Sequence, residues 1–118
     1  MLLIPNFSKG MPPRLAIGYT DSAGETVQRM LPDSKVIKAF NIVGDMHPDF
    51  PGCPPTMFIC GDDGGAKKTL IDNIPTKFGW ETIDIGGTEG ARLLEPLTFL
   101  WITDYFGTCK QKALIYIL

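Results

Sequence analysis

The chain has 118 residues, of which 44% are hydrophobic and 20% are charged, and its formal net charge is −2. These values are typical of one globular domain with a single core, and they exclude the basic surface that a nucleic-acid partner would require. No apolar run approaches the roughly 18 residues of a membrane span, and Met1-Leu-Leu-Ile-Pro5 lacks the charged start and the length of a signal peptide. We therefore expect one domain over residues 1–118 in the cytoplasm, without nucleic-acid or membrane partners.

The cysteine and histidine content predicts reduced thiols and no metal site. Three cysteines, Cys53, Cys60 and Cys109, are too few and too widely spaced for a disulfide framework. The sequence has no Cys-x-x-Cys or His-x-x-x-His pair that could begin a tetrahedral site. His47 lies in a loop between two aspartates, so it is either a general acid or base or, as is commoner, a surface residue.

The first regular element is predicted to be a helix that follows a loop. The Pro, Gly and Ser content of Pro5 to Arg14 is typical of a loop. The helix is expected over Asp21 to Leu31, where Ser22 and Glu25 have the spacing of a capping box. In that arrangement the hydroxyl accepts a hydrogen bond from the backbone of Glu25, and the carboxylate reaches back to the backbone of Ser22. Pro32 ends the helix.

Two short strands are predicted next, over Lys35–Asn41 and Thr56–Asp63. β-Branched and aromatic residues dominate both, and turn residues flank them. Their nearly continuous apolar runs are typical of strands that are covered on both faces in an α/β sheet. Each run ends in small polar residues, and ligands of open α/β sheets bind beyond such strand ends.

The connection between these strands, Gly44–Pro55, contains four prolines and no helical pattern. A parallel crossover normally needs a helix or about a dozen residues. Two interpretations stay open, namely a compressed crossover and neighbouring strands of mixed direction.

A second helix and a further strand follow. The helix is expected over Ala66–Ile74, with one of the two preceding aspartates as its N-cap and with Pro75 ending it early. Phe78 and Trp80 are then expected to fold back onto the core. Glu81–Ile85 alternates polar and apolar residues as a half-buried strand does.

The turn Gly86–Gly90 is the one local candidate for a phosphate cradle, because a strand precedes it and a helix follows it. Its spacing departs from the dinucleotide-binding fingerprint, and Glu89 would repel an anion that the helix dipole attracts. A tight helix start is therefore favoured. Arg92 and Glu95, three residues apart on that helix, are expected to pair with each other.

The last helix, Thr88–Tyr105, is apolar around nearly its whole circumference, so it must be buried on all sides. Pro96 is expected to kink it. We expect a two-fold homodimer in which the same patch serves both subunits. The residues expected to form this contact are Leu93, Leu97, Leu100 and Trp101. Alternatively, the apolar tail Lys110–Leu118 folds over the helix and the protein is a monomer.

Several short motifs occur in the order found in one protein family. They are Lys38-Ala-Phe-Asn41, Met57-Phe-Ile-Cys-Gly-Asp-Asp63, Ala66-Lys67 and Arg92-Leu-Leu-Glu-Pro-Leu97. Together they resemble the second half of the NADP oxidoreductases that depend on the deazaflavin coenzyme F420, and the first motif also resembles the related NADPH domains of the STEAP metalloreductases. The resemblance implies a truncated Rossmann-like α/β fold with a short, mostly parallel or mixed sheet flanked by helices.

The resemblance also implies a function, namely hydride transfer between NADP(H) and a deazaflavin such as F420 or a similar acceptor. Ala39, Phe40 and Asn41 would line the nicotinamide side. The family's Gly-x-Gly-x-x-Gly turn, which cradles the pyrophosphate, has no counterpart in this sequence, so the domain is expected to be incomplete on its own. No side chain is an obvious catalytic acid, base or nucleophile. The alternative is a non-catalytic dimerisation or interaction module, or a split-enzyme fragment derived from that family.

Overall fold

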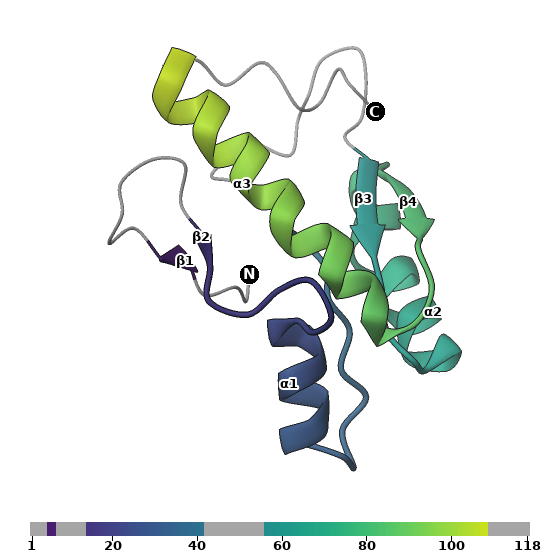
Figure 1. Cartoon of the computed structure of the whole chain (residues 1–118). Helices are drawn as coiled ribbons and strands as arrows, with labels where there is room; N and C mark the ends of the chain where they lie inside the picture. Colours follow the sequence, from purple (N-terminus) through teal and green to yellow (C-terminus); the bar gives the residue numbers. More distant parts are fainter. Residues whose placement is uncertain (1–4, 7–13, 42–55, 109–118) are drawn as a thin grey trace.

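The computed structural model describes residues 5–6, 14–41 and 56–108 and has the predicted α/β class (Figure 1). Its elements are β1 (Pro5–Asn6), β2 (Arg14–Leu15), α1 (Ala23–Met30), β3 (Thr56–Ile59), α2 (Gly64–Asn73), η1 (Pro75–Phe78), β4 (Glu81–Asp84), η2 (Thr88–Gly90) and α3 (Ala91–Thr108). β3 and β4 are parallel, whereas β1 and β2 form a separate antiparallel pair.

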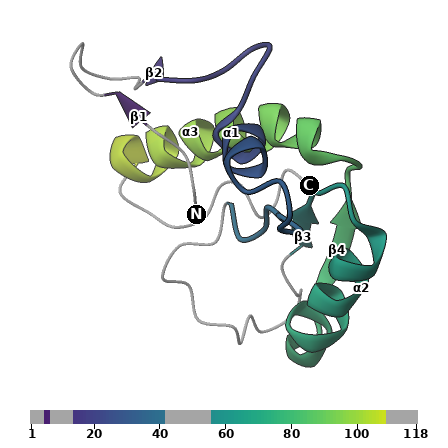
Figure 2. The same cartoon turned by 90° about the horizontal axis from the view of Figure 1, so that it is seen from below.

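The β3–β4 pair lies between α3 and α2 (Figure 2). Met57 and Ile59 of β3 are 2% and 0% exposed, whereas Thr56 and Phe58 are half-buried, so the predicted cover of both faces is complete on one face only. Cys60 packs with Ala91 and Leu94 in the core cluster. α2 has no buried residue. Phe58 of β3 packs against the cluster on α3. Because successive side chains of a strand point to opposite faces, the fully buried Met57 and Ile59 lie on the other face of the sheet.

The start of α1 confirms one half of the predicted capping box. The Ser22 hydroxyl accepts a hydrogen bond from the backbone N–H of Glu25 at 3.1 Å and donates one to the Glu25 carboxylate at 2.7 Å. The backbone N–H of Ser22 donates to Asp21 instead, so the predicted return bond from Glu25 to that N–H is wrong. The side-chain cap nevertheless fixes where α1 begins.

The predicted strand Lys35–Asn41 is wrong except at one residue. Lys38 forms an isolated antiparallel bridge with Cys60, with N···O distances of 2.9 and 3.1 Å. Phe40 has a φ of 57°, and this left-handed conformation ends the extended chain. The bridge is antiparallel, so the direction agrees with the mixed arrangement and not with a parallel crossover, although no second strand forms here.

The antiparallel direction places the polar ends of the two predicted strands apart. Beyond Lys38 the chain runs toward the amino end of β3, and the N–H of Phe40 lies 3.1 Å from the sulfur of Met57. Asn41 therefore lies away from the Gly61–Asp63 turn at the opposite end of β3.

The residues after α2 agree with the prediction only in part. α2 ends before Pro75, which begins η1, and Gly79 follows with a φ of 71°. Trp80 is half-buried, but Phe78 is 53% exposed, so its predicted return to the core is wrong. The Phe78 ring packs instead against Trp80, with ring centroids 5.8 Å apart.

Three apolar residues of later elements also lie outside the core. Ile83 of β4, which was expected on the inner face, is 40% exposed. Leu94 of α3 is buried, whereas Leu93 and Leu100 are 72% and 55% exposed. Pro96 lies inside α3, which Figure 1 shows as one continuous helix. Within this chain, α3 thus has an exposed apolar face and is not enclosed on all sides.

The predicted loop Pro5 to Arg14 is wrong at its two ends, where β1 and β2 pair. The connection 44–55 with His47 and Cys53, the residue Cys109 and the tail 110–118 lie outside the described residues. Among the described helices, none has the length and hydropathy that a membrane span requires.

Candidate functional site

A buried carboxylate joins three parts of the fold. Glu95 of α3 is 1% exposed, and its two oxygens accept hydrogen bonds from the backbone N–H groups of Ala23 and Gly24 at 3.0 and 2.9 Å. The first N–H groups of a helix have no acceptor within the helix and carry partial positive charge, so the carboxylate supplies both acceptor and counter-charge for α1. The ammonium group of Lys38 lies 3.7 Å from the same carboxylate.

The expected pair between Arg92 and Glu95 is therefore wrong. Arg92 instead donates to Glu25 of α1, with Nε at 2.9 Å from Oε2. The hydrogen bond from Arg92 holds the pKa of Glu25 below its ordinary value. Burial lowers the pKa of Lys38, and the nearby carboxylate of Glu95 opposes that change. α1 and α3 are thus joined by two carboxylates, Glu25 in a partly buried contact and Glu95 in a buried one.

Asn41, one of the three predicted cofactor residues, is held by α3. It is 3% exposed, and its amide nitrogen donates to the carbonyl of Leu94 and to the hydroxyl of Thr98. The Thr98 hydroxyl in turn donates to the backbone carbonyl of Asn41 at 3.0 Å. Because the carbonyl of Leu94 can only accept, the NH₂ group of Asn41 must face α3.

The amide oxygen of Asn41 therefore faces away from α3. This oxygen is buried and has no hydrogen-bond partner in the part of the chain that the structure describes. Phe40 is half-buried, and its ring centroid lies 6.4 Å from that of Trp80. Ala39 is also half-buried. The structure therefore brings Ala39, Phe40 and Asn41 together beside α3 and Trp80.

The glycine-rich turn before α3 already holds a carboxylate. Asp62, just after β3, accepts a hydrogen bond from the backbone N–H of Thr88 at 2.8 Å, and this bond lowers the pKa of Asp62. Gly90 packs so closely that an added Cβ would lie 2.9 Å from the Cβ of Cys60. These contacts support a tight helix start. They do not favour a phosphate cradle, because the N–H of Thr88 already binds a carboxylate.

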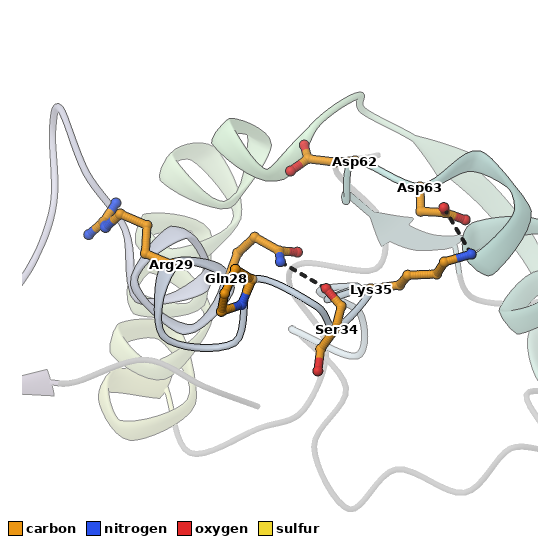
Figure 3. A pocket seen from close by; sticks show the side chains of 7 residues that line it. Gln28, Arg29, Ser34, Lys35, Asp62 and Asp63 are labelled. Atoms are coloured by element: carbon orange, nitrogen blue, oxygen red, sulfur yellow. Dashed lines mark hydrogen bonds and ion pairs between the residues drawn. The ribbon is translucent and has the colours of Figure 1, made fainter.

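An open pocket of ≈ 410 Å³ lies near the same end of β3 (Figure 3). Its lining residues are Gln28, Arg29, Pro32, Ser34, Lys35, Asp62 and Asp63. Lys35 pairs with Asp63 at 3.1 Å, and Arg29 pairs with Asp21 at 2.7 Å. Both cations are therefore neutralised within the chain, and none of the predicted cofactor residues lines the pocket.

Among the residues that the structure describes, Cys60 gives no separate site. Burial raises the pKa of the Cys60 thiol to about 11, which disfavours the nucleophilic thiolate. Among the described residues, no group of three His, Cys, Asp or Glu side chains is arranged to hold a metal ion.

Comparison with known proteins identifies relatives of the chain. No family model matches it. The F420-dependent NADP reductase of Methanocaldococcus jannaschii is 36% identical over 93 residues, which are 77% of this chain and 42% of that protein. A crystal structure of a proposed F420-dependent NADP reductase from Arthrobacter sp. FB24 has 32% identity and a TM-score of 0.77, and the match covers 90% of this chain and 50% of that one. The chain resembles the F420-dependent NADP reductases. It spans half or less of the length of these two relatives.

The motifs by which the sequence resembles F420-dependent NADP reductases lie against one another in the fold. Lys38 contacts Glu95, and Asn41 contacts the backbone of Leu94. Thr98 was not predicted as part of the site. The available signal was its spacing, because residues three and four apart share a helix face, and Thr98 follows Leu94 and Glu95 at those intervals.

Proposed function

We propose that this chain supplies the nicotinamide side of an NADP-dependent oxidoreductase-type domain. In this proposal, hydride passes between NADP(H) and a deazaflavin such as coenzyme F420 or a similar acceptor, and the domain is incomplete on its own. The names of the similar reductases support the choice of cofactors. A bound cofactor would supply the hydride chemistry, whereas the chain would bind and orient it.

The observation that carries the proposal is that the buried amide oxygen of Asn41 has no hydrogen-bond partner among the described residues. A buried acceptor without a donor costs about 1–3 kcal/mol, so a donor from a ligand would be favourable there. The carboxamide N–H of a nicotinamide is such a donor. The half-buried ring of Phe40, next in the chain, would offer an apolar edge to the nicotinamide ring.

The opposite end of the described sheet does not fit a pyrophosphate. Asp62 occupies the N–H of Thr88 at the helix start, and Glu89 lies in the same turn. Both carboxylates would repel an anion. We therefore assign no contact with the phosphates to this turn.

The proposal predicts that the chain responds to the nicotinamide part of the cofactor. We expect NADPH and reduced nicotinamide mononucleotide to change the amide spectrum of the protein around Phe40, and 2′,5′-ADP to leave it unchanged. Asn41→Ala should weaken binding of both nicotinamide compounds about tenfold, because one buried hydrogen bond is lost. Asn73→Ala, which removes an exposed amide of α2, is the matched control.

Titration followed by two-dimensional NMR checks this prediction, with circular dichroism used to verify that each variant is folded. The absence of any response of the unaltered chain to millimolar NADPH and mononucleotide would reject the proposal. Equal affinities of folded Asn41→Ala and the unaltered chain would remove Asn41 from the site.

The second candidate function is a non-catalytic interaction module that forms a homodimer. The exposed Leu93 and Leu100 favour it, because residues seven apart lie on the same helix face. Leu97, half-buried between them, continues this face, and Trp101 belongs to the proposed contact as well. A two-fold contact would cover the face with its own copy.

Light scattering at micromolar concentration tests the dimer. We expect a dimeric mass for the unaltered chain and a monomeric mass for Leu100→Glu, since a charge would be buried in the contact. Lys77→Glu, at an exposed position of η1, should remain dimeric. A monomeric mass of the unaltered chain, constant on dilution, would reject this candidate.

A further inference from the structure

We infer that Thr98 of α3 is a positioning residue for the nicotinamide side of the site. In this inference Thr98 does not contact the cofactor. Instead, Thr98 fixes the conformation in which Phe40 and Asn41 contact the cofactor. The inference rests on the proposed function. Its supporting contacts, however, lie entirely within the described residues.

The first support is the reciprocal contact between Thr98 and Asn41. The hydroxyl of Thr98 accepts from the side-chain amide of Asn41 and donates to the backbone carbonyl of the same residue. Thr98 is 0% exposed, so these bonds form away from competing water. One hydroxyl thus fixes both the backbone and the side chain of Asn41.

The second support is that α3 holds the segment Lys38–Asn41 at both ends. Glu95 pairs with Lys38 at one end, and Thr98 binds Asn41 at the other. Between them, Phe40 has a φ of 57°, a conformation that is unfavourable for a residue with a Cβ. Such a conformation persists only where the surrounding contacts enforce it.

The consequence for binding follows from the direction of the Asn41 amide. Its NH₂ group donates to α3, so only the amide oxygen, which is buried, lacks a partner among the described residues and could accept from a ligand donor. If the Thr98 hydroxyl is removed, the carbonyl of Asn41 loses this donor and the turn at Phe40 loses one of its restraints. The amide oxygen would then no longer be held in one place, and binding would include the cost of ordering it.

The test compares Thr98→Val, which keeps the branched shape without the hydroxyl, with Thr98→Ser, which keeps the hydroxyl. Reduced nicotinamide mononucleotide is titrated into each folded variant. We expect Thr98→Val to bind about tenfold more weakly and Thr98→Ser to bind as the unaltered chain does. The side-chain amide resonances of Asn41 should move in Thr98→Val and keep their positions in Thr98→Ser.

The outcomes separate this inference from the proposed function. If the unaltered chain binds and Thr98→Val binds equally well, the positioning role is wrong and the proposed function stands. If both variants bind weakly, the hydroxyl is not the cause and the inference is also wrong. If the unaltered chain does not bind, both proposals fail. Thr98→Ala replaces Thr98→Val if the latter does not fold, and unfolding of both would show a purely structural role.

Discussion

Replacing Glu95 by alanine is expected to destabilise the protein by about 3–5 kcal/mol, because it breaks a buried ion pair by removing one partner. The Lys38 side chain is 7% exposed and would lose the nearby carboxylate. The N–H groups of Ala23 and Gly24 would also lose their acceptor at the start of α1. The substitution therefore weakens α1, α3 and the segment around Lys38 together.

Urea denaturation followed by circular dichroism measures this effect. Glu89→Ala is the control, since it removes an exposed glutamate next to the same helix and should change the free energy of unfolding by no more than about 0.5 kcal/mol. The double variant Glu95→Leu with Lys38→Met should recover part of the loss, because an apolar pair needs no counter-charge. A loss below about 1 kcal/mol in Glu95→Ala would contradict the role assigned to this carboxylate.

Gly61→Ala should have the second-largest effect, a loss of about 1–3 kcal/mol from overpacking. An added Cβ would lie 2.7 Å from the carbonyl oxygen of Val36 and 2.6 Å from the Cδ1 of Ile37. The carbonyl belongs to the backbone, so it cannot move aside as a flexible side chain would. Relief requires the segment around Lys38 to shift away from β3 and strains its bridge to Cys60.

Gly64→Ala is the matched control for this prediction. Gly64 is the first residue of α2, and no atom lies within 4 Å of a Cβ added there. Alanine should be neutral or slightly stabilising at this position. Thermal unfolding of the two variants compares them directly, and equal melting temperatures would mean that Gly61 is not needed for close packing.

Elements with strong local signals were predicted from the sequence. The Ser22 hydroxyl fixes the start of α1, and Asp63 caps α2 by accepting a hydrogen bond from Ala66 at 2.7 Å. Pro75 ends α2 because it cannot continue the hydrogen-bond pattern. These signals act within a few residues, so the sequence is sufficient to locate them.

The segment around Lys38 was mispredicted because distant contacts decide its conformation. Its β-branched and aromatic residues favour a strand, and the bridge to Cys60 preserves one pair of that pattern. Asn41 turns away to reach Thr98, which is 57 residues further along the chain. No local pattern contains that information, and tertiary contacts override the strand propensity.

For the candidate site, the sequence located three neighbouring residues but not their surroundings. Ala39, Phe40 and Asn41 do lie together, as adjacent residues must, but their partners on α3 were not predicted. Spacing on one helix suggested that Arg92 and Glu95 pair, whereas both reach α1 across the fold. An ion pair between neighbours on a helix surface is weak, and a buried backbone donor is a stronger partner for a carboxylate.

The distance in sequence between Glu95 and the start of α1 also bears on how the protein folds during synthesis. The carboxylate that completes α1 follows Ala23 by 72 residues. At about 5–20 residues per second, the ribosome adds Glu95 roughly 4–14 seconds after Ala23. An isolated helix of 8 residues is marginal in water. α1 therefore spends this interval without its tertiary cap, and it becomes a stable part of the molecule only after the first turns of α3 have left the ribosome.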